Sequence, residues 1–288
     1  DLRGNSGGLL DEAASLTGLF INDGPLVQLK GTNEKIDVIE DPIPGSIYDG
    51  PMVVLIDRFS ASASEIFAGA IQDYRRGIII GQKTYGKGSV QSLYPLDRYS
   101  RFTSKKGFGQ LTLTIAKYYR VTGAGTQNKG VIPDIVLPSF IDERLIGEET
   151  KINSLPWDKI PSLEFNTNNS LKEPIHFIEN NFKSRSENNL PFDYLKEDIK
   201  RSFEQRENSI VSLNIETRTA SREQILKENK GRRSSRLKAL GFEEDSFDDF
   251  RNQTILNEIY NMVVDYINYL NPPVLNDEEN LFVEASNQ

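Results

Sequence analysis

The pattern of hydrophobic and polar positions predicts an α/β unit in the first part of the chain. Residues 51–60, PMVVLIDRFS, form a continuous apolar run typical of a strand buried on both faces, and residues 78–80 are three isoleucines. Residues 61–74, which lie between these runs, place their apolar side chains on one face of a helix. A strand, a helix and a strand with short connections indicate a parallel arrangement.

The flanking segments extend this unit on both sides. The chain begins with a short strand end and the turn Gly7-Gly8, after which residues 9–16 show a helical apolar stripe. Residues 109–121 alternate apolar residues with threonines, as a strand does, and residues 128–138 contain two prolines that suit only an edge or an end of a sheet.

The composition changes after about residue 140. Residues 141–175 are polar connections, and charged helical patterns follow, the clearest at 247–270, where Ile255, Ile259, Val263, Ile267 and Leu270 recur every three or four residues. We therefore predict an α/β domain over 1–140, a linker over 141–175 and a mainly helical domain over 176–288.

Composition and charge narrow the class of function. A formal charge of −8 argues against a nucleic-acid partner. The sequence contains no apolar run of 18 residues, so it predicts no integral membrane segment. The basic run 230–238 is typical of a solvated helix face. The chain has no cysteine and one histidine, His176, far from any glycine-rich loop, so a nucleophile or base has to come from other residue types. We expect no metal or organic cofactor.

Ser62 stands at the start of the helix that follows the first buried strand. The pattern Ser62-Ala-Ser-Glu65 is that of a capping box, which puts Ser62 beside the unpaired amides and the positive end of a helix. A hydroxyl that attacks a carbonyl there would form its oxyanion next to hydrogen-bond donors. Simple helix capping is the alternative interpretation of the same pattern.

Lys87 lies in a glycine-rich loop with two interpretations. Gly81, Gly86 and Lys87 have the spacing of a phosphate-binding loop, but the next residue is Gly88 rather than Ser or Thr, and a strand-like segment follows instead of a helix. A lysine can instead act as a general base where burial favours its neutral amine. We favour Lys87 as the base and rank Lys83 below it.

Four stretches together carry a family resemblance: DLRGNSGGLL (1–10), DRFSASASEIFAGAIQDY (57–74), TYGKGSVQ (84–91) and KGVIPDI (129–135). In order and spacing the chain resembles the tail-specific, or C-terminal processing, serine proteases, and LPWD (155–158) is similar to their C-terminal extension. The resemblance implies Ser62 as nucleophile, Lys87 as general base and Gln91 as the group that orients the lysine. It implies that the amides of Ala63 and Gly8 form the oxyanion hole, and the supporting positions are Asp73, Arg3, Gly7, Glu65 and Thr84.

Geometry limits two of these roles. Asp73 lies eleven residues after Ser62, about 16 Å further along a straight helix, so we expect it to be structural and to pair with Arg3, Arg75 or Arg76. Gln91 lies four residues after Lys87, about 13 Å along a straight strand, so contact with the lysine requires a bend.

The resemblance also implies a wider context. It implies a crotonase-like βα protease core, protein or peptide substrates with apolar C-termini, an adaptor protein and a periplasmic or cell-envelope location. We expect the sequence to be a piece of a longer protein whose PDZ domain lies upstream of residue 1. The alternative hypothesis is a non-catalytic fragment or scaffold whose helical domain docks a partner protein.

Overall fold

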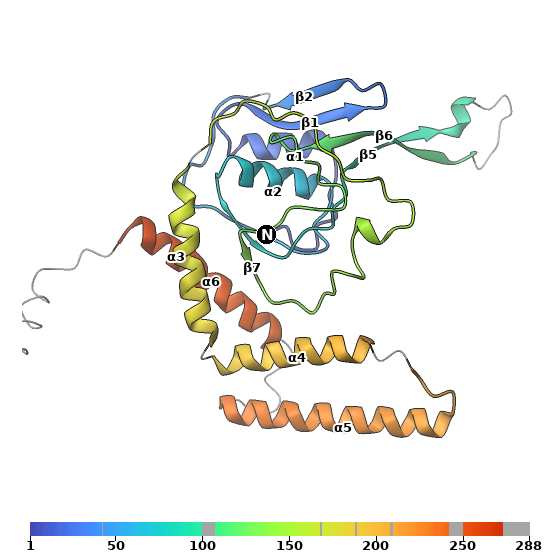
Figure 1. The fold of residues 1–288 in the computed structure, drawn as a ribbon, viewed down its shortest axis with the longest axis vertical. Helices are drawn as coiled ribbons and strands as arrows, with labels where there is room; N and C mark the ends of the chain where they lie inside the picture. Colours follow the sequence, from blue (N-terminus) through green and yellow to red (C-terminus); the bar gives the residue numbers. More distant parts are fainter. Residues whose placement is uncertain are drawn as a thin grey trace, which may run out of the picture. The chain divides into compact units, whose positions relative to one another are not determined.

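The computed structural model describes residues 1–41, 43–99, 107–167, 169–187, 189–207, 210–241 and 250–272. It divides into two compact units, Asp1–Ile175 and His176–Gln288 (Figure 1). The segment that we predicted as a linker, 141–175, belongs to the first unit. Residues 247–249 of the predicted last helix lie outside the described residues.

The predicted parallel unit is confirmed in the first of two sheets. Strands β3 (Val53–Ile56) and β4 (Ile78–Gly81) pair in parallel, and helix α2 (Ala63–Asp73) connects them. Strand β7 (Ile135–Val136) pairs in parallel with β4 at the edge, where the prolines predicted it. Ser62 follows β3 and lies beyond its carboxyl end. In parallel α/β sheets this is the end where binding and catalytic sites commonly lie.

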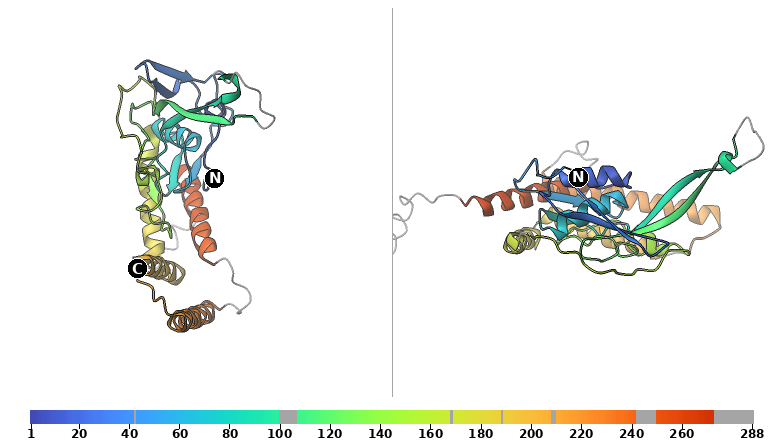
Figure 2. Two further views of the ribbon diagram at one scale, coloured as in Figure 1. Left: turned by 90° about the vertical axis from the view of Figure 1, so that its right-hand side faces the viewer. Right: turned by 90° about the horizontal axis from the view of Figure 1, so that it is seen from above.

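The second sheet is antiparallel, in the order β2-β1-β6-β5. It contains the predicted strands β5 (Ser89–Pro95) and β6 (Gln110–Tyr119), and two strands that the hydrophobic pattern did not predict, β1 (Pro25–Gly31) and β2 (Ile36–Glu40). Figure 2 shows the outer ends of β5 and β6 extending away from the rest of the first unit.

The core of the first unit forms where α2 packs against the strands and against helix α1 (Leu10–Gly18), its neighbour in Figure 1. Fully buried side chains from β3, α2, β4 and the segments after β6 meet there: Ile56, Ile71, Ile79, Val121 and Val131. Each aliphatic side chain buried in this way contributes about 1.5–3 kcal/mol to folding. A second cluster joins Val27, Ala63, Ile66 and Tyr118 and holds the beginning of α2 against the antiparallel sheet.

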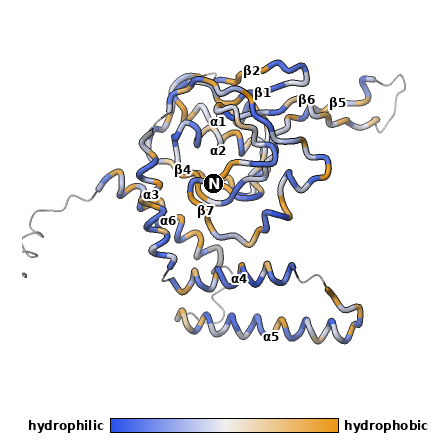
Figure 3. Tube along the Cα trace, viewed as in Figure 1, coloured by the Kyte–Doolittle hydropathy of each residue, from blue (hydrophilic) through white to orange (hydrophobic). Residues whose placement is uncertain are grey.

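The second unit is helical, which confirms the predicted fold class of an α/β core followed by a mainly helical domain. It contains α4 (Leu190–Glu207), α5 (Ile215–Leu240) and α6 (Phe250–Leu270), together with most of α3 (Lys172–Glu187). Helix α5, which carries the basic run, is mostly hydrophilic (Figure 3), and Leu237 is its one buried residue. Three 3-10 helices lie in the first unit, at Leu96–Tyr99, Glu148–Thr150 and Asn169–Leu171.

The predicted last helix is confirmed over its described residues as α6, although its recurring apolar residues are not all buried. Ile259 is buried, but Ile267 and Leu270 are 44% and 45% exposed. The buried face of α6 instead includes Glu258, which is 2% exposed and accepts hydrogen bonds from Arg185 of α3. A paired charge can occupy an interior position that an apolar pattern cannot reveal.

Candidate active site

Ser62 is the residue on which the chain turns from β3 into α2. It is the N-cap of α2, is half-buried, and has φ 56° and ψ −113°, a conformation that L residues other than glycine rarely adopt. Backbone strain of this kind costs about 1–3 kcal/mol and is concentrated at functional sites. The residues on either side, Ala61 and Ala63, have small side chains and are buried.

Glu65 connects the serine to the lysine loop. Its carboxylate completes the predicted capping box by accepting the Ser62 amide at 2.7 Å, and it also accepts the Lys87 amide at 2.9 Å. The Gly86 amide and the Thr84 hydroxyl donate to its other oxygen, at 2.7 and 2.5 Å. One buried carboxylate therefore fixes the backbone of Ser62 and of Lys87 at the same time.

The environment of Glu65 opposes its charge. The side chain is fully buried, and burial raises the pKa of its carboxyl to about 7, although the four hydrogen bonds favour the ionised form. Two donors point at each oxygen. A proton on Oε2 would displace one of two amides, and a proton on Oε1 could be accepted only by the Thr84 hydroxyl, which would then no longer donate. We call these four hydrogen bonds to the Glu65 carboxylate the Glu65 clamp. All four are present only when Glu65 is ionised.

Lys87 and Gln91 lie within reach of each other. The Lys87 Nζ is 3.4 Å from Gln91 Oε1, and the lysine side chain is half-buried. Beside this contact the pairing of β5 with β6 shifts register between Val90 and Gln91, opposite the unpaired residue Ile115 of β6.

The turn Gly7-Gly8 lies against the beginning of α2. Gly7 has φ +96°, and a Cβ on it would lie 2.6 Å from the Ala61 oxygen and 2.9 Å from the Ala63 nitrogen. Gly8, by contrast, is exposed, and a Cβ on it would meet nothing within 4 Å. The structure thus places Gly7 beside the Ala63 amide, while the oxyanion hole of the Ala63 and Gly8 amides stays a prediction.

Replacing Gly7 with alanine is expected to be damaging, and Gly8→Ala serves as its matched control. Gly7→Ala forces both a strained φ and a collision with the backbone beside Ser62, so we expect it to destabilise the protein by about 1–3 kcal/mol. Gly8→Ala keeps the amide and meets no atom, so stability should change by less than about 0.5 kcal/mol. Thermal unfolding of both variants measures this difference, and equal losses would contradict the close approach at Gly7.

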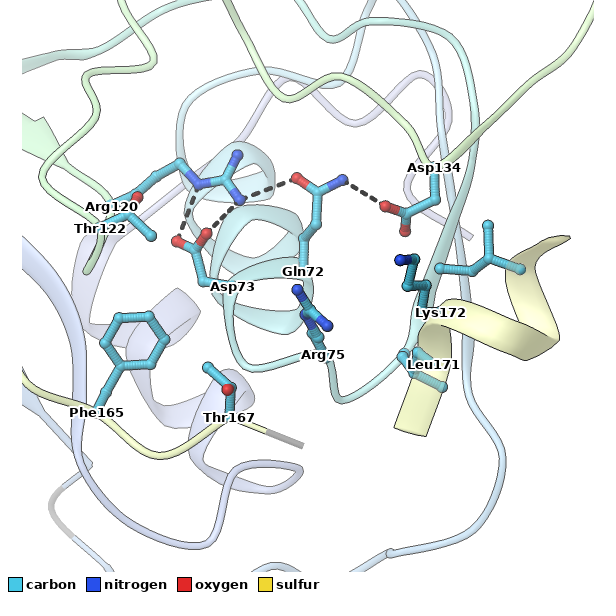
Figure 4. A pocket seen from close by; sticks show the side chains of 12 residues that line it. Gln72, Asp73, Arg75, Arg120, Thr122, Asp134, Phe165, Thr167, Leu171 and Lys172 are labelled. Carbon is cyan, nitrogen blue, oxygen red and sulfur yellow. Dashed lines mark hydrogen bonds and ion pairs between the residues drawn. The ribbon is translucent and has the colours of Figure 1, made fainter. Parts of the chain in front are cut away.

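Asp73 ends α2 at the opposite end from Ser62 and pairs with Arg120. The two side chains form a bidentate ion pair, and Arg120 also donates to Gln72 Oε1 and to the Gly69 carbonyl (Figure 4). The expected partners Arg3 and Arg76 are wrong, because Arg3 pairs with Asp1 at 2.7 Å and Arg76 donates to backbone carbonyls. The pocket in Figure 4 surrounds this ion pair, so it lies away from Ser62.

Sequence reasoning missed several residues that hold the loops of the site. Arg58, although fully buried, donates to the carbonyls of Thr84 and Ile146 and pairs with Glu149. The Asn5 carbonyl accepts the Ala61 amide at 3.0 Å, which fastens the first residues of the chain to the turn before Ser62. An arginine directly after a buried strand was the available signal for Arg58, whereas a main-chain contact such as that of Asn5 leaves no signal.

The described part of the chain offers neither a metal site nor a membrane-spanning helix. No group of three or more His, Cys, Asp or Glu side chains there is placed to hold a metal ion. None of the helices in that part is both long and apolar enough to cross a membrane.

The fold and the site define a class of protein. Residues 1–137 match the model of peptidase family S41, and residues 141–268 match the C-terminal domain of tail specific protease. Residues 1–137 therefore belong to peptidase family S41, and residues 141–268 to the family of the C-terminal domain of tail specific protease.

The chain is also similar to individual proteins. The chain is 44% identical over 229 residues to the tail-specific protease of Haemophilus influenzae, covering 76% of this chain and 32% of that protein. It is 42% identical over 153 residues to a carboxy-terminal-processing protease of Bartonella bacilliformis, covering 53% of this chain and 33% of that protein. A solved structure, the photosystem II D1 C-terminal processing protease, is 33% identical with a TM-score of 0.42. The match covers 48% of this chain and 33% of that chain. The chain spans about a third of the length of these relatives.

Proposed function

We propose that the chain carries the catalytic centre of a serine endopeptidase that cleaves proteins near their C-termini through an acyl-enzyme on Ser62. The observation that carries the proposal is the Glu65 carboxylate, which binds the backbone amides of both Ser62 and Lys87. A serine with a strained backbone at a helix N-terminus, fastened to a loop with a lysine, is an arrangement suited to a nucleophile and a base.

The reaction follows from these groups. The neutral Lys87 amine takes the proton of the Ser62 hydroxyl as the serine oxygen attacks the substrate carbonyl carbon. The amides of Ala63 and Gly8 stabilise the resulting oxyanion. Collapse of this intermediate breaks the peptide C–N bond, and the departing amine takes the proton from the Lys87 ammonium. Lys87 then deprotonates a water molecule, which hydrolyses the acyl ester and regenerates Ser62.

In this mechanism Gln91 orients the lysine. Its Oε1 accepts from the Lys87 amine, a contact that restricts where the amine points. Thr84 and Gly7 support the site through Glu65 and through the turn beside Ala63. We assign no contact at the centre to Arg3 and a structural role to Asp73.

Covalent labelling tests this function. A serine-directed fluorophosphonate is expected to add one phosphonyl group to the protein, located on Ser62 by peptide mass mapping. Ser62→Ala should lose the adduct, and Ser64→Ala should keep it, because the Ser64 hydroxyl donates to the Asn5 carbonyl and only positions the chain. An adduct located on any other serine, or none on the wild type, would refute Ser62 as the nucleophile.

The wider context rests on the family resemblance. We propose protein substrates with apolar C-termini, an adaptor protein and a periplasmic or cell-envelope location on that basis. Docking of a partner by the helical unit, the alternative hypothesis, stays a prediction.

A further inference from the structure

Tyr118 contacts the backbone of both proposed catalytic residues. It lies near the end of β6, is 2% exposed, and its hydroxyl is 2.6 Å from the carbonyl oxygen of Lys87 and 3.1 Å from that of Ser62. Its backbone amide also donates to the Gly88 carbonyl at 2.9 Å. Tyr118 therefore binds the carbonyl groups of both Lys87 and Gly88.

The hydroxyl proton belongs to the Lys87 carbonyl. That contact is the shorter one, and the Ser62 carbonyl already accepts the amides of Glu65 and Ile66, at 2.8 and 3.0 Å. A hydroxyl has one proton to donate, so the contact with Ser62 is the secondary one. It nevertheless places the oxygen of Tyr118 directly between the two backbone segments.

Tyr118 and Glu65 divide the backbone of the site between them. Glu65 accepts the amide of Ser62 and the amide of Lys87, while Tyr118 faces the carbonyl of each. We propose that Tyr118 is a positioning residue that, together with Glu65, fixes the Lys87 backbone relative to Ser62. The inference rests on the proposed function, because it gives Tyr118 a part in that reaction.

Two features keep the Tyr118 hydroxyl a donor and its ring in place. Burial, followed by the nearby charge of Glu65, raises the pKa of the Tyr118 hydroxyl well above its ordinary value, so it stays protonated. The ring packs in the cluster with Val27, Ala63 and Ile66, contacts that phenylalanine would preserve.

Arg120 anchors the strand that carries Tyr118. Two residues after the tyrosine, its guanidinium pairs with Asp73 and donates to the Gly69 carbonyl, so the end of β6 is fastened to the C-terminal end of α2 (Figure 4). Tyr118 contacts the N-terminal end of the same helix. The end of β6 is therefore held at both ends of α2, by Tyr118 at one end and by Arg120 at the other.

Tyr118→Phe tests the inference, with Tyr119→Phe as the matched control. Tyr119 is the next residue and is also buried, but its hydroxyl donates to Asp158 and does not contact the site. We expect Tyr118→Phe to lower kcat for peptide cleavage about tenfold, the effect of losing one hydrogen bond that holds the base, with KM unchanged. Tyr119→Phe should stay within twofold of the wild type.

Hydrogen exchange gives a readout that needs no activity. Amides of residues 84–91 should exchange faster in Tyr118→Phe than in the wild type, and at the wild-type rate in Tyr119→Phe. Unchanged exchange in Tyr118→Phe, a loss confined to KM, or equal losses of kcat in both variants would overturn the inference. A wild-type protein that neither cleaves peptide nor takes the label would refute the proposed function instead, and the exchange result would still decide whether Tyr118 positions the loop.

Discussion

Replacing Lys87 with alanine is expected to lower kcat for peptide cleavage by about 10⁴-fold, the upper end of what a positioned general base contributes. The reason is chemical, because within the described site the Lys87 amine is the basic group whose loop the Glu65 clamp fixes to Ser62. Peptide turnover by the purified variant, followed by mass spectrometry of the products, measures the loss.

Lys83→Ala is the control for that variant. Lys83 lies in the same loop, but its amine pairs with Glu149 at 2.9 Å, so its removal should change kcat by less than about tenfold. If Lys83→Ala lost more activity than Lys87→Ala, Lys83 would be the base, and the choice between the two lysines would be wrong.

Glu65→Gln is expected to lower kcat by about 10²-fold, the scale of a small misplacement of reacting groups. A glutamine offers one acceptor oxygen, so its NH₂ group would face two of the four donors that now bind the carboxylate. If the NH₂ group replaces Oε2, the amides of Ser62 and Lys87 both lose their acceptor. If it replaces Oε1, the loop before Lys87 loses the acceptor of the Gly86 amide. Glu258→Gln, which removes a buried charge from the helical unit, should leave kcat unchanged.

The pKa of Glu65 also predicts opposite pH trends for activity and stability. Since the clamp requires the ionised carboxylate, its contribution to kcat should rise with pH through about 7. Stability should move the other way, because the folded pKa of about 7 lies above the ordinary value of 4.5 and the folded state holds the proton more tightly. This contribution is fully present below about pH 4.5 and is lost by about pH 7.

The size of the stability change follows from the shift. It corresponds to about 3 kcal/mol lost between those two pH values. Denaturant unfolding of the wild type and of Glu65→Gln across pH 4.5 to 7.5 isolates it, because the glutamine variant lacks this titration. Parallel stability curves for the two proteins would show that Glu65 ionises freely despite its burial.

The sequence predicted the parallel part of the fold because its strands are continuous apolar runs. It did not predict β1 and β2, for a physical reason that each strand shows. In β1, Gln28 is 1% exposed and donates to the carbonyls of Arg120 and Pro161, so a polar residue interrupts the buried pattern. Strand β2 has no buried residue, so no alternation of buried and exposed positions marks it as a strand.

The site was predictable in its residues and not in its connections. The motifs singled out Ser62, Lys87 and Gln91, but not the 3.4 Å contact between the last two, nor the register shift of β5 against β6 beside it. The partner of Asp73 was equally hidden, since Arg120 lies 47 residues away in the sequence. Local patterns indicate which groups have useful chemistry, while tertiary pairing decides which of them meet.

The most direct test of the account is the rate at which a fluorophosphonate modifies Ser62 in the wild type and in Lys87→Ala at the same pH. The measurement separates the base from substrate binding, because the small probe needs only an activated hydroxyl. The account predicts that the rate falls by at least about 10²-fold in Lys87→Ala while circular dichroism stays that of the wild type. Labelling of Ser62 at the wild-type rate in that variant would contradict it.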